Sequence, residues 1–350
     1  MSQTKTSEPP SSANLALRLD GPFHDGERQA QQLANVDPRW QLTAGAMIRD
    51  QMSEQHRQFF ELLPTLVVGG VDADGWPWAS MLHGEPGFAH SPDPQRLRID
   101  ALPRDDDPLA AATHSGHPIG LLGLQPHSRR RNRMNGRVIE RDESGLTVRV
   151  DQSFGNCPQY IQARRPLPIT TSMPRRDAAD PDGTDLVATA LGTDGALSPR
   201  ARALIGRSDT TFIASAALGD DIDTRHGVDV SHRGGRAGFV ELGTHGAATR
   251  LTLPDYRGNR LFNTLGNLLS SPRAGLLFVD YVTGDALQIT ADAEIVWKGP
   301  EVAAYEGAQR LVRLWVRQAR WRDALLPFGW TAATYAPQLA RAEDPVDDGR

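Results

Sequence analysis

A segment in the last third of the sequence carries the residue types that bind a phosphate group. It reads GNRLFNTLGNLLSSPR (258–273), a glycine turn followed by a stretch of helical character that ends before Pro272. Asn259 or Asn263 can cap this helix, and Arg260 is expected in its first turn. Free backbone N–H groups, the positive end of the helix dipole and a guanidinium would then act on one phosphate monoester. The plainer alternative is a turn and a helix cap that bind no ligand.

A second segment, HGVDVSHRGGRAGFVEL (226–242), combines polar side chains with the pattern of a strand. Asp229, Ser231 and Arg233 occupy alternate positions and His232 lies between two of them, so in a strand His232 points to the opposite face. The two glycines that follow permit a bulge or the close approach of a ligand ring. Ser231 and His232 diverge in a strand and are not a catalytic dyad. The alternative is an ordinary strand and hairpin.

The arginine content restricts how this protein can hold an anion. The chain has 350 residues and a net charge of -5, and 36 of its 38 basic residues are arginines, since the only lysines are Lys5 and Lys298. A phosphate-loop NTPase or a pyridoxal phosphate enzyme needs a lysine at its site. The sequence also lacks GxxxxGK, GxGxxG, GxSxG and HExxH motifs. Anions are therefore expected to be held by arginine, backbone N–H groups and helix ends.

Charge and cysteine content exclude other classes of partner and site. The negative net charge gives no basic footprint for nucleic acid, and apolar runs such as TLVV (65–68) are far shorter than a membrane helix. The single cysteine, Cys157, excludes an internal disulfide framework and a cysteine-rich metal site. We expect it to be a packed thiol, and we predict no metal site. The sequence predicts a soluble, cytoplasmic protein without nucleic-acid or membrane partners.

The composition and hydrophobic pattern of the sequence change several times along the chain. We expect a disordered tail over residues 1–20, followed by a helical segment with a first β-rich domain over 21–165. A linker is expected over 166–200, a second β-rich domain over 201–335 and an acidic tail over 336–350. The second domain is expected to end in a helix over 301–325, where Leu311, Leu314, Trp315 and Trp321 recur at helical spacing.

The two β-rich blocks look like copies of each other. Five segments of the first block are similar in sequence to five segments of the second, in the same order. The pairs are 65–75 and 211–221, 86–90 and 237–241, 96–99 and 250–253, 118–124 and 272–279, and 135–140 and 290–296. The repeat predicts a mainly β fold with a duplicated antiparallel unit. The two copies would pack as a pseudo-dimer within the chain. A homodimer of whole chains remains an open alternative.

Three motifs of the second block together carry a family resemblance. DVSHRGG (229–235), PDYRGNRLFNTLGNL (254–268) and SPRAGLLF (271–278) resemble the pyridoxamine 5′-phosphate oxidase-like, FMN-binding split-barrel family. The resemblance covers residues 45–300 approximately. It implies two tandem split β-barrels with flanking helices, FMN as cofactor and an FMN-dependent oxidoreductase. Electrons would come from a small-molecule donor such as NAD(P)H or from a separate reductase.

The resemblance also implies which residues would bind the cofactor. In the family the phosphate lies where Asn259, Arg260, Asn263 and Thr264 fall, and the flavin ring lies near Leu253, Pro254, Asp255, Ser231, His232 and Arg233. It assigns no catalytic acid or base to this chain. The serine–arginine–lysine phosphate cluster of the vitamin oxidase itself is not matched, so pyridoxamine phosphate is not expected as the substrate.

The first block differs from the second at the phosphate segment. It has three aspartates, at 105–107, which would repel a phosphate, so we expect one flavin per chain. The arginine run SRRRNR (128–133) is either a solvated edge strand or a contact for an anionic nicotinamide cofactor. Two rival functions stay open. One is a haem-binding or haem-degrading split barrel with His232 or His83 as axial ligand, and the other is a flavin-binding module without enzymatic activity.

Overall fold

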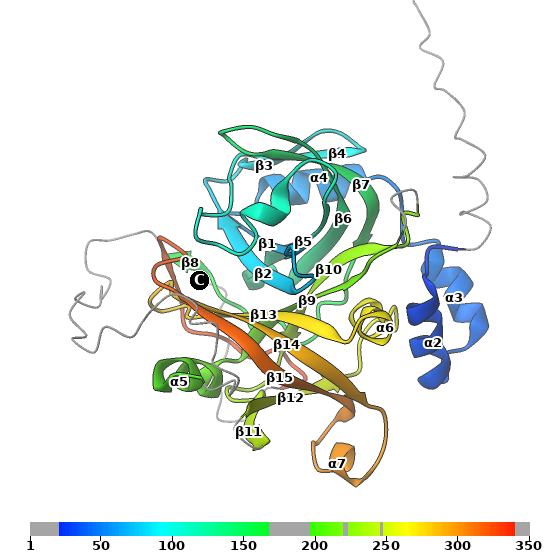
Figure 1. Ribbon diagram of the computed structural model, residues 1–350. Helices are drawn as coiled ribbons and strands as arrows, with labels where there is room; N and C mark the ends of the chain where they lie inside the picture. Colours follow the sequence, from blue (N-terminus) through cyan, green and yellow to red (C-terminus); the bar gives the residue numbers. More distant parts are fainter. Residues whose placement is uncertain (1–20, 168–196, 220–222, 246–247, 340–350) are drawn as a thin grey trace, which may run out of the picture.

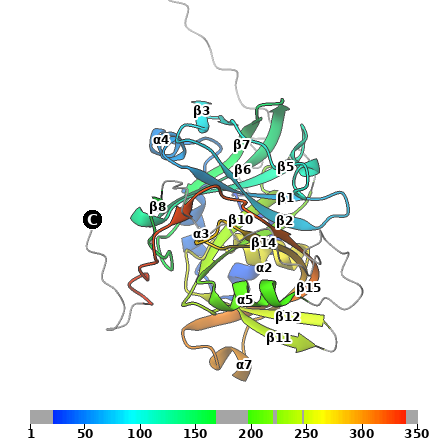
Figure 2. The same cartoon turned by 90° about the vertical axis from the view of Figure 1, so that its left-hand side faces the viewer.

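The computed structural model describes residues 21–167, 197–219, 223–245 and 248–339 of the chain. Two seven-stranded antiparallel sheets follow one another along the sequence, and we call them the first and the second β unit. Figures 1 and 2 show the first unit above the second. The expected mainly β architecture of two tandem units is confirmed. The expected N-terminal tail, most of the expected linker and most of the expected acidic tail lie outside the described residues.

The first β unit holds strands β1 to β7 in the order β2-β1-β5-β6-β7-β4-β3 across the sheet. Their bounds are β1 Thr65–Val71, β2 Pro77–His83, β3 Ala89–Asp93, β4 Arg96–Ile99, β5 Pro118–Gln125, β6 Arg130–Arg141 and β7 Leu146–Gly155. Asp72 fixes the turn between β1 and β2, because its Oδ1 accepts from the backbone N–H groups of Asp74 and Trp76 at 3.0 and 2.8 Å.

The second β unit repeats this topology strand for strand. Its order is β10-β9-β13-β14-β15-β12-β11, which is the first order with eight added to every number. The bounds are β9 Thr210–Ala217, β10 Gly227–Gly234, β11 Glu241–His245, β12 Ala248–Tyr256, β13 Arg273–Val279, β14 Ala286–Val296 and β15 Ala308–Arg322. The internal duplication predicted from five paired segments is therefore confirmed.

Helices and short elements flank the two units. They are α2 Asp25–Leu33, α3 Pro38–Gly45, α4 Glu54–Glu61, α5 Pro199–Arg207, α6 Asn263–Ser270, α7 Pro300–Ala303, the 3-10 turns η1 Ala111–Thr113 and η2 Pro126–Ser128, and a two-stranded sheet of β8 Pro166–Leu167 and β16 Gly329–Trp330. Helix α6 connects β12 to β13, where the first unit has only η1. Within the described ranges, every helix is too short or too polar to span a bilayer.

The expected C-terminal helix over 301–325 is wrong. Only α7 is helical there, and most of the segment is the long strand β15, which pairs with β12 and β14. Val312, Leu314 and Val316 are buried while the residues between them are more exposed. This period of two, in β-branched and aromatic residues, outweighs the helical spacing of the leucines and tryptophans once two strands are available for pairing.

The two units pack face to face through equivalent strands. Strand β5 contacts β10 and, reciprocally, β13 contacts β2; β1 contacts β10, and β9 contacts β2. A shared apolar cluster that includes Val67, Leu122, Phe212, Val230 and Leu277 fills this contact. Because each contact has its repeat equivalent, the units are related as the halves of a pseudo-dimer.

Two equivalent glycines set how closely the units approach. Gly120 in β5 and Gly275 in β13 occupy matching positions in their sheets. A Cβ atom at Gly120 would lie 2.6 Å from the carbonyl oxygen of Val228, and one at Gly275 would lie 2.5 Å from the carbonyl oxygen of Pro77. Only a residue without Cβ lets the facing backbones come this near.

We expect Gly120→Ala and Gly275→Ala each to lower the free energy of unfolding by about 1–3 kcal/mol, because the methyl group forces the units apart. Gly206→Ala in α5 is the matched control, since a Cβ there meets nothing within 4 Å and alanine favours a helix by up to about 1 kcal/mol. Urea denaturation followed by tryptophan fluorescence measures all three variants. Parent-like stability of both interface variants would contradict the packing described.

Candidate functional site

A cavity opens between the two β units where the start of α6 meets β6 and β10. Its volume is about 100 Å³, and residues of both units line it. We call it the interunit pocket. It is lined by Leu122, Arg131, Arg133, Asn156, Ser231, His232, Arg233, Asp255, Tyr256, Gly258, Asn259, Arg260, Phe262, Asn263, Thr264, Leu265, Gln309 and Arg310.

Most of the residues predicted from the sequence meet at this pocket. Those that line it are Ser231, His232, Arg233, Asp255, Asn259, Arg260, Asn263 and Thr264. The other two do not reach it, because Leu253 packs in the core of the second unit and Pro254 is buried opposite Leu311. Strand β12 therefore reaches the pocket through its C-terminal end rather than along its length.

Helix α6 begins at the pocket, but neither predicted asparagine caps it. The N-cap residue is Phe262, which has a left-handed backbone (φ 65°) and makes no side-chain cap bond. Asn259 instead closes a turn by accepting from the N–H of Leu261 at 3.2 Å, and Asn263 is the first helical residue. Arg260, expected in the first helical turn, precedes the helix and is exposed. The first N–H groups of α6 are thus uncapped donors at the pocket wall.

Two arginines of the pocket come from the first β unit and were not predicted as site residues. Arg131 and Arg133 lie in β6, which runs between β5 and β7 and so is not an edge strand. Side chains alternate along a strand, and Arg130 accordingly lies outside the pocket, 4.8 Å from the ring centre of Phe59. The alternation was visible in the sequence, but which face meets the second unit was not.

Arg133 is a buried hub of hydrogen bonds, with 3% of its surface exposed. Its Nη1 donates to Asp229 Oδ1 and to Asn263 Oδ1, both at 2.9 Å, and its Nη2 donates to Ser231 Oγ. Ser231 Oγ lies 2.9 Å from Thr264 Oγ1. One side chain of the first unit thereby fixes the strand and the helix start of the second unit that line the pocket.

Arg131 and His232 form a further contact between the units. Arg131 Nη1 lies 3.1 Å from His232 Nδ1. A guanidinium only donates, so Nδ1 accepts and the neutral ring carries its proton on Nε2. Burial lowers the pKa of His232 well below its ordinary value, and nearby Arg131 and Arg233 lower it further. Burial also lowers the pKa of Arg131, to about 9, and nearby Arg133 and Arg233 lower it further, whereas Cys157 opposes the shift.

The pocket carries an excess of positive charge. Five of its lining residues are arginines and one is an aspartate. Asp255 pairs with Arg233 at 2.8 Å and with Arg310 at 3.6 Å. Arg131 and Arg260 have no carboxylate partner within the part of the chain that the structure describes. The positive charge of these two arginines is therefore not neutralised by a carboxylate of the described chain, which suits a site that binds an anion.

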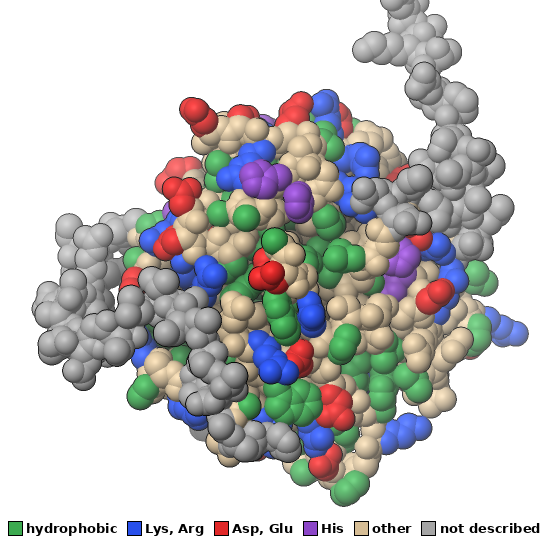
Figure 3. Space-filling model, in the orientation of Figure 1, with side chains coloured by type: hydrophobic (Ala, Val, Ile, Leu, Met, Phe, Trp, Pro, Cys, Tyr) green, Lys and Arg blue, Asp and Glu red, His purple; other side chains and the backbone are tan. Residues whose placement is uncertain are grey.

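Unpaired donors in the lining residues point to the same chemistry. Arg131 Nε, Arg133 Nε and Asn156 Nδ2 are buried and have no hydrogen-bond partner. Buried donors are normally satisfied, so an acceptor-rich ligand fits here. The charge excess is local, since basic and acidic side chains are interspersed on the face shown in Figure 3.

In the first β unit, the equivalent position is filled by a carboxylate of the chain itself. The strand registers make Ser80 the equivalent of Ser231 and Gln288 the equivalent of Arg133. Asp107, which is 4% exposed, accepts there from Ser80 Oγ at 2.5 Å and from Gln288 Nε2 at 3.2 Å. The pseudo-symmetry of the fold therefore does not extend to the charge of the two sites.

Comparison with known proteins finds similar solved structures. A putative pyridoxamine 5′-phosphate oxidase from Lactobacillus delbrueckii is 14% identical, with a TM-score of 0.28, and the match covers 37% of this chain and 96% of that chain. The H111A variant of HupZ from Group A Streptococcus is 11% identical, with a TM-score of 0.28, over 36% of this chain and 99% of that one. HutZ, the heme storage protein from Vibrio cholerae, is 10% identical, with a TM-score of 0.21, over 40% and 96% of the two chains.

The chain is similar in structure to pyridoxamine 5′-phosphate oxidase-like proteins. The similarity is partial and extends to the fold alone. No family model and no curated protein matches the sequence.

We expect the free energy of unfolding to fall as the pH is lowered through about 6.5, the ordinary pKa of histidine. The pKa of His232 is lowered in the folded state, so the unfolded chain takes up its proton first. This one ring contributes at most about 1.4 kcal/mol per pH unit. Thermal unfolding between about pH 5 and pH 8 measures the slope.

The variant His232→Gln should show a shallower slope than the parent. His114→Gln is the control, since His114 is exposed on the first β unit, and it should follow the parent. A slope in His232→Gln that equals the parent slope would contradict a buried neutral ring.

Proposed function

We propose that this chain binds FMN in the interunit pocket and is an FMN-dependent oxidoreductase. The observation that carries the proposal is the lining of that pocket, where arginines of both β units and the uncapped start of α6 converge with unpaired donors. A phosphate monoester is the part of FMN that this donor set fits.

The residues that would hold the phosphate come from both units. Arg131 and Arg260 lack carboxylate partners among the described residues, and the hydroxyls of Ser231 and Thr264 lie together at the start of α6. The backbone N–H groups of that helix would add donors aligned with its dipole. This assignment keeps Arg260, Ser231 and Thr264 from the residues implied by the family resemblance and adds Arg131.

The enclosed part of the pocket suits the phosphate end of the cofactor. Its volume of about 100 Å³ is below the roughly 300–1,000 Å³ of a site that encloses a whole cofactor-sized ligand. The flavin ring would extend beyond it, next to the aromatic side chains of Tyr256 and Phe262 in the lining. Tyr160 stacks on Tyr256 at 5.1 Å and supports that wall.

The chain's own contribution to the reaction would be electrostatic. FMN, when bound, supplies the electron transfer itself. The positive guanidinium groups around the pocket would favour the negatively charged, reduced form of a bound cofactor. His232 would hold its proton on Nε2 throughout the neutral pH range. No side chain is assigned as general acid or base. The electron donor would be NAD(P)H or a separate reductase.

A haem-binding function has less support from the site. The pocket lining is dominated by arginine and polar side chains, whereas a haem plane needs an apolar slot. His232 Nδ1 is engaged by Arg131, and His83 is exposed on β2, outside the pocket. A flavin-binding module without activity shares the proposed site and differs only in turnover with a reductant.

We expect the purified protein to show absorbance bands near about 370 and 450 nm, and one flavin per chain after heat release. The expected ratio follows from Asp107, which fills the equivalent position of the first unit. Comparison of released flavin with protein concentration gives the ratio. A single strong band near about 400 nm would identify haem instead, and a ratio of two would show that the first unit also binds flavin.

We expect Arg131→Ala to raise the dissociation constant for FMN on the order of ten- to a hundredfold, because a charge-assisted hydrogen bond contributes roughly 1.5–3 kcal/mol. Arg130→Ala is the matched control, since it removes the same side chain one position away on the opposite face of β6. Arg260→Ala should have a smaller effect than Arg131→Ala because Arg260 is exposed. Titration of apo-protein, followed by flavin fluorescence at one salt concentration, compares the variants. Equal losses for Arg130→Ala and Arg131→Ala would place the phosphate elsewhere.

A further inference from the structure

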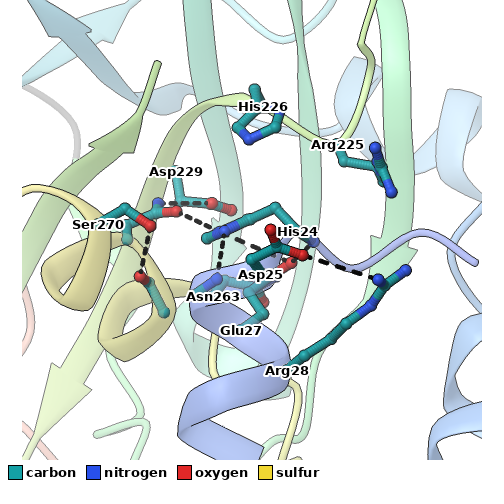
Figure 4. A network of polar contacts seen from close by, with 12 residues as sticks. His24, Asp25, Glu27, Arg28, Arg225, His226, Asp229, Asn263 and Ser270 are labelled. Atoms are coloured by element: carbon teal, nitrogen blue, oxygen red, sulfur yellow. Dashed lines mark hydrogen bonds and ion pairs between the residues drawn. The ribbon is translucent and has the colours of Figure 1, made fainter. Parts of the chain in front are cut away.

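Helix α2 belongs to neither β unit, yet it packs directly against α6, the helix that starts at the interunit pocket (Figure 4). Two glycines allow this contact. A Cβ atom at Gly26 would lie 2.2 Å from the carbonyl oxygen of Gly266, and one at Gly266 would lie 2.6 Å from the Cα of Glu27. The backbone of Glu27 is therefore held against the first turns of α6.

The Glu27 side chain reaches the pocket through one amide. Asn263 Nδ2 donates to Glu27 Oε1, and Asn263 Oδ1 accepts from Arg133 Nη1 at 2.9 Å. Arg133 can only donate, so the amide oxygen must face it and the amide nitrogen must face Glu27. Burial raises the pKa of the Glu27 carboxyl, and Asp229 raises it further. The carboxyl group keeps an acceptor oxygen for Asn263 in either protonation state.

A second amide, one helical turn further along α6, makes a parallel link. Asn267 Oδ1 lies 2.9 Å from His24 Nε2, and Asn267 Nδ2 donates to Asp229 Oδ2 at 2.9 Å. Within α2 the links are joined, since the N–H of His24 donates to Glu27 Oε2 at 3.0 Å. Burial lowers the pKa of His24, which keeps its Nδ1 free to accept from the N–H of Gly26 at 3.2 Å.

Together with the Arg133–Asp229 ion pair, these bonds close a ring of six residues, in which the backbone N–H of His24 makes the link to Glu27. The members are His24, Glu27, Arg133, Asp229, Asn263 and Asn267, and none is more than 7% exposed. The ring joins α2, α6, β6 and β10. Two of its members, Arg133 and Asn263, line the interunit pocket.

We infer that Glu27 is a positioning residue for the interunit pocket, acting through Asn263 on Arg133. The inference rests on the proposed function in that its ligand is the phosphate group assigned above. Without Glu27, the Asn263 amide nitrogen is a buried donor that has lost its acceptor. The amide then turns toward another acceptor, which takes its oxygen away from Arg133, and Arg133 and the start of α6 are no longer held in the binding geometry. Helix α2 contributes no residue to the pocket lining. It nevertheless sets the affinity of the pocket for its ligand.

A double-mutant cycle on ligand affinity tests this coupling. The variants are Glu27→Ala, Asn263→Ala and both together, and the probes are FMN and inorganic phosphate, each titrated into the full chain. We expect Glu27→Ala to weaken both probes about tenfold, and to have no further effect when Asn263 is already alanine. Gln31→Leu is the matched control, because Gln31 is also buried on α2 but donates to the carbonyl of Leu261 rather than into the ring. If Glu27→Ala does not fold, Glu27→Met, which keeps much of the side-chain volume but offers no oxygen to Asn263, takes its place in the cycle.

The outcomes separate this inference from the proposed function. Parent-like affinity of the Glu27 variant, additive losses in the double variant, or an equal loss in Gln31→Leu would each overturn the positioning role. A parent protein that binds phosphate but not FMN would overturn the proposed function, and the cycle would still be measured with phosphate. A parent that binds neither probe would overturn both.

Discussion

The arrangement of this protein depends on one buried ion pair between its two β units, Arg133 of the first and Asp229 of the second, at 2.9 Å. Removing two charges from water is costly, and further hydrogen bonds to the paired groups offset part of that cost. Asp229 accordingly also accepts from Asn135 at 2.7 Å and from Asn267 at 2.9 Å. Arg133 also donates to Ser231 and to Asn263 at the start of α6. The same side chain therefore holds the two units together and fixes the positions of residues that line the pocket.

The internal repeat shows how one fold can hold a charged and a neutralised version of the same site. The topology of the two units is identical, but Arg133 in one has Gln288 as its equivalent in the other. At the position with glutamine, the buried carboxylate of Asp107 accepts from Ser80 and from the Gln288 amide nitrogen. At the position with arginine, donors are left over and the site is open to an external anion. The exchange of Arg133 for Gln288 and the buried Asp107 together are the basis for expecting one flavin per chain.

Much of the fold was predictable from the sequence, because strand periodicity and a repeat are local and ordered signals. The pocket-lining residues of β10 and of the turn before α6 could be named in advance because they lie in short contiguous motifs. Arg131, Arg133 and Glu27 could not be placed beside them, because they come from other segments and only tertiary packing brings them to the second unit. The error over 308–322 has a related cause: leucines and tryptophans with both helical and alternating spacing became a strand because β12 and β14 offered partners on either side.

In the proposed function, the interunit pocket recognises the phosphate of a flavin nucleotide. The most direct test compares FMN with riboflavin, which has the same ring and no phosphate, in fluorescence titrations of the apo-protein. Loss of two or more charge-assisted hydrogen bonds of roughly 1.5–3 kcal/mol each predicts that FMN binds on the order of a hundredfold tighter or more. Equal affinities for FMN and riboflavin would contradict a phosphate site built from Arg131 and the start of α6.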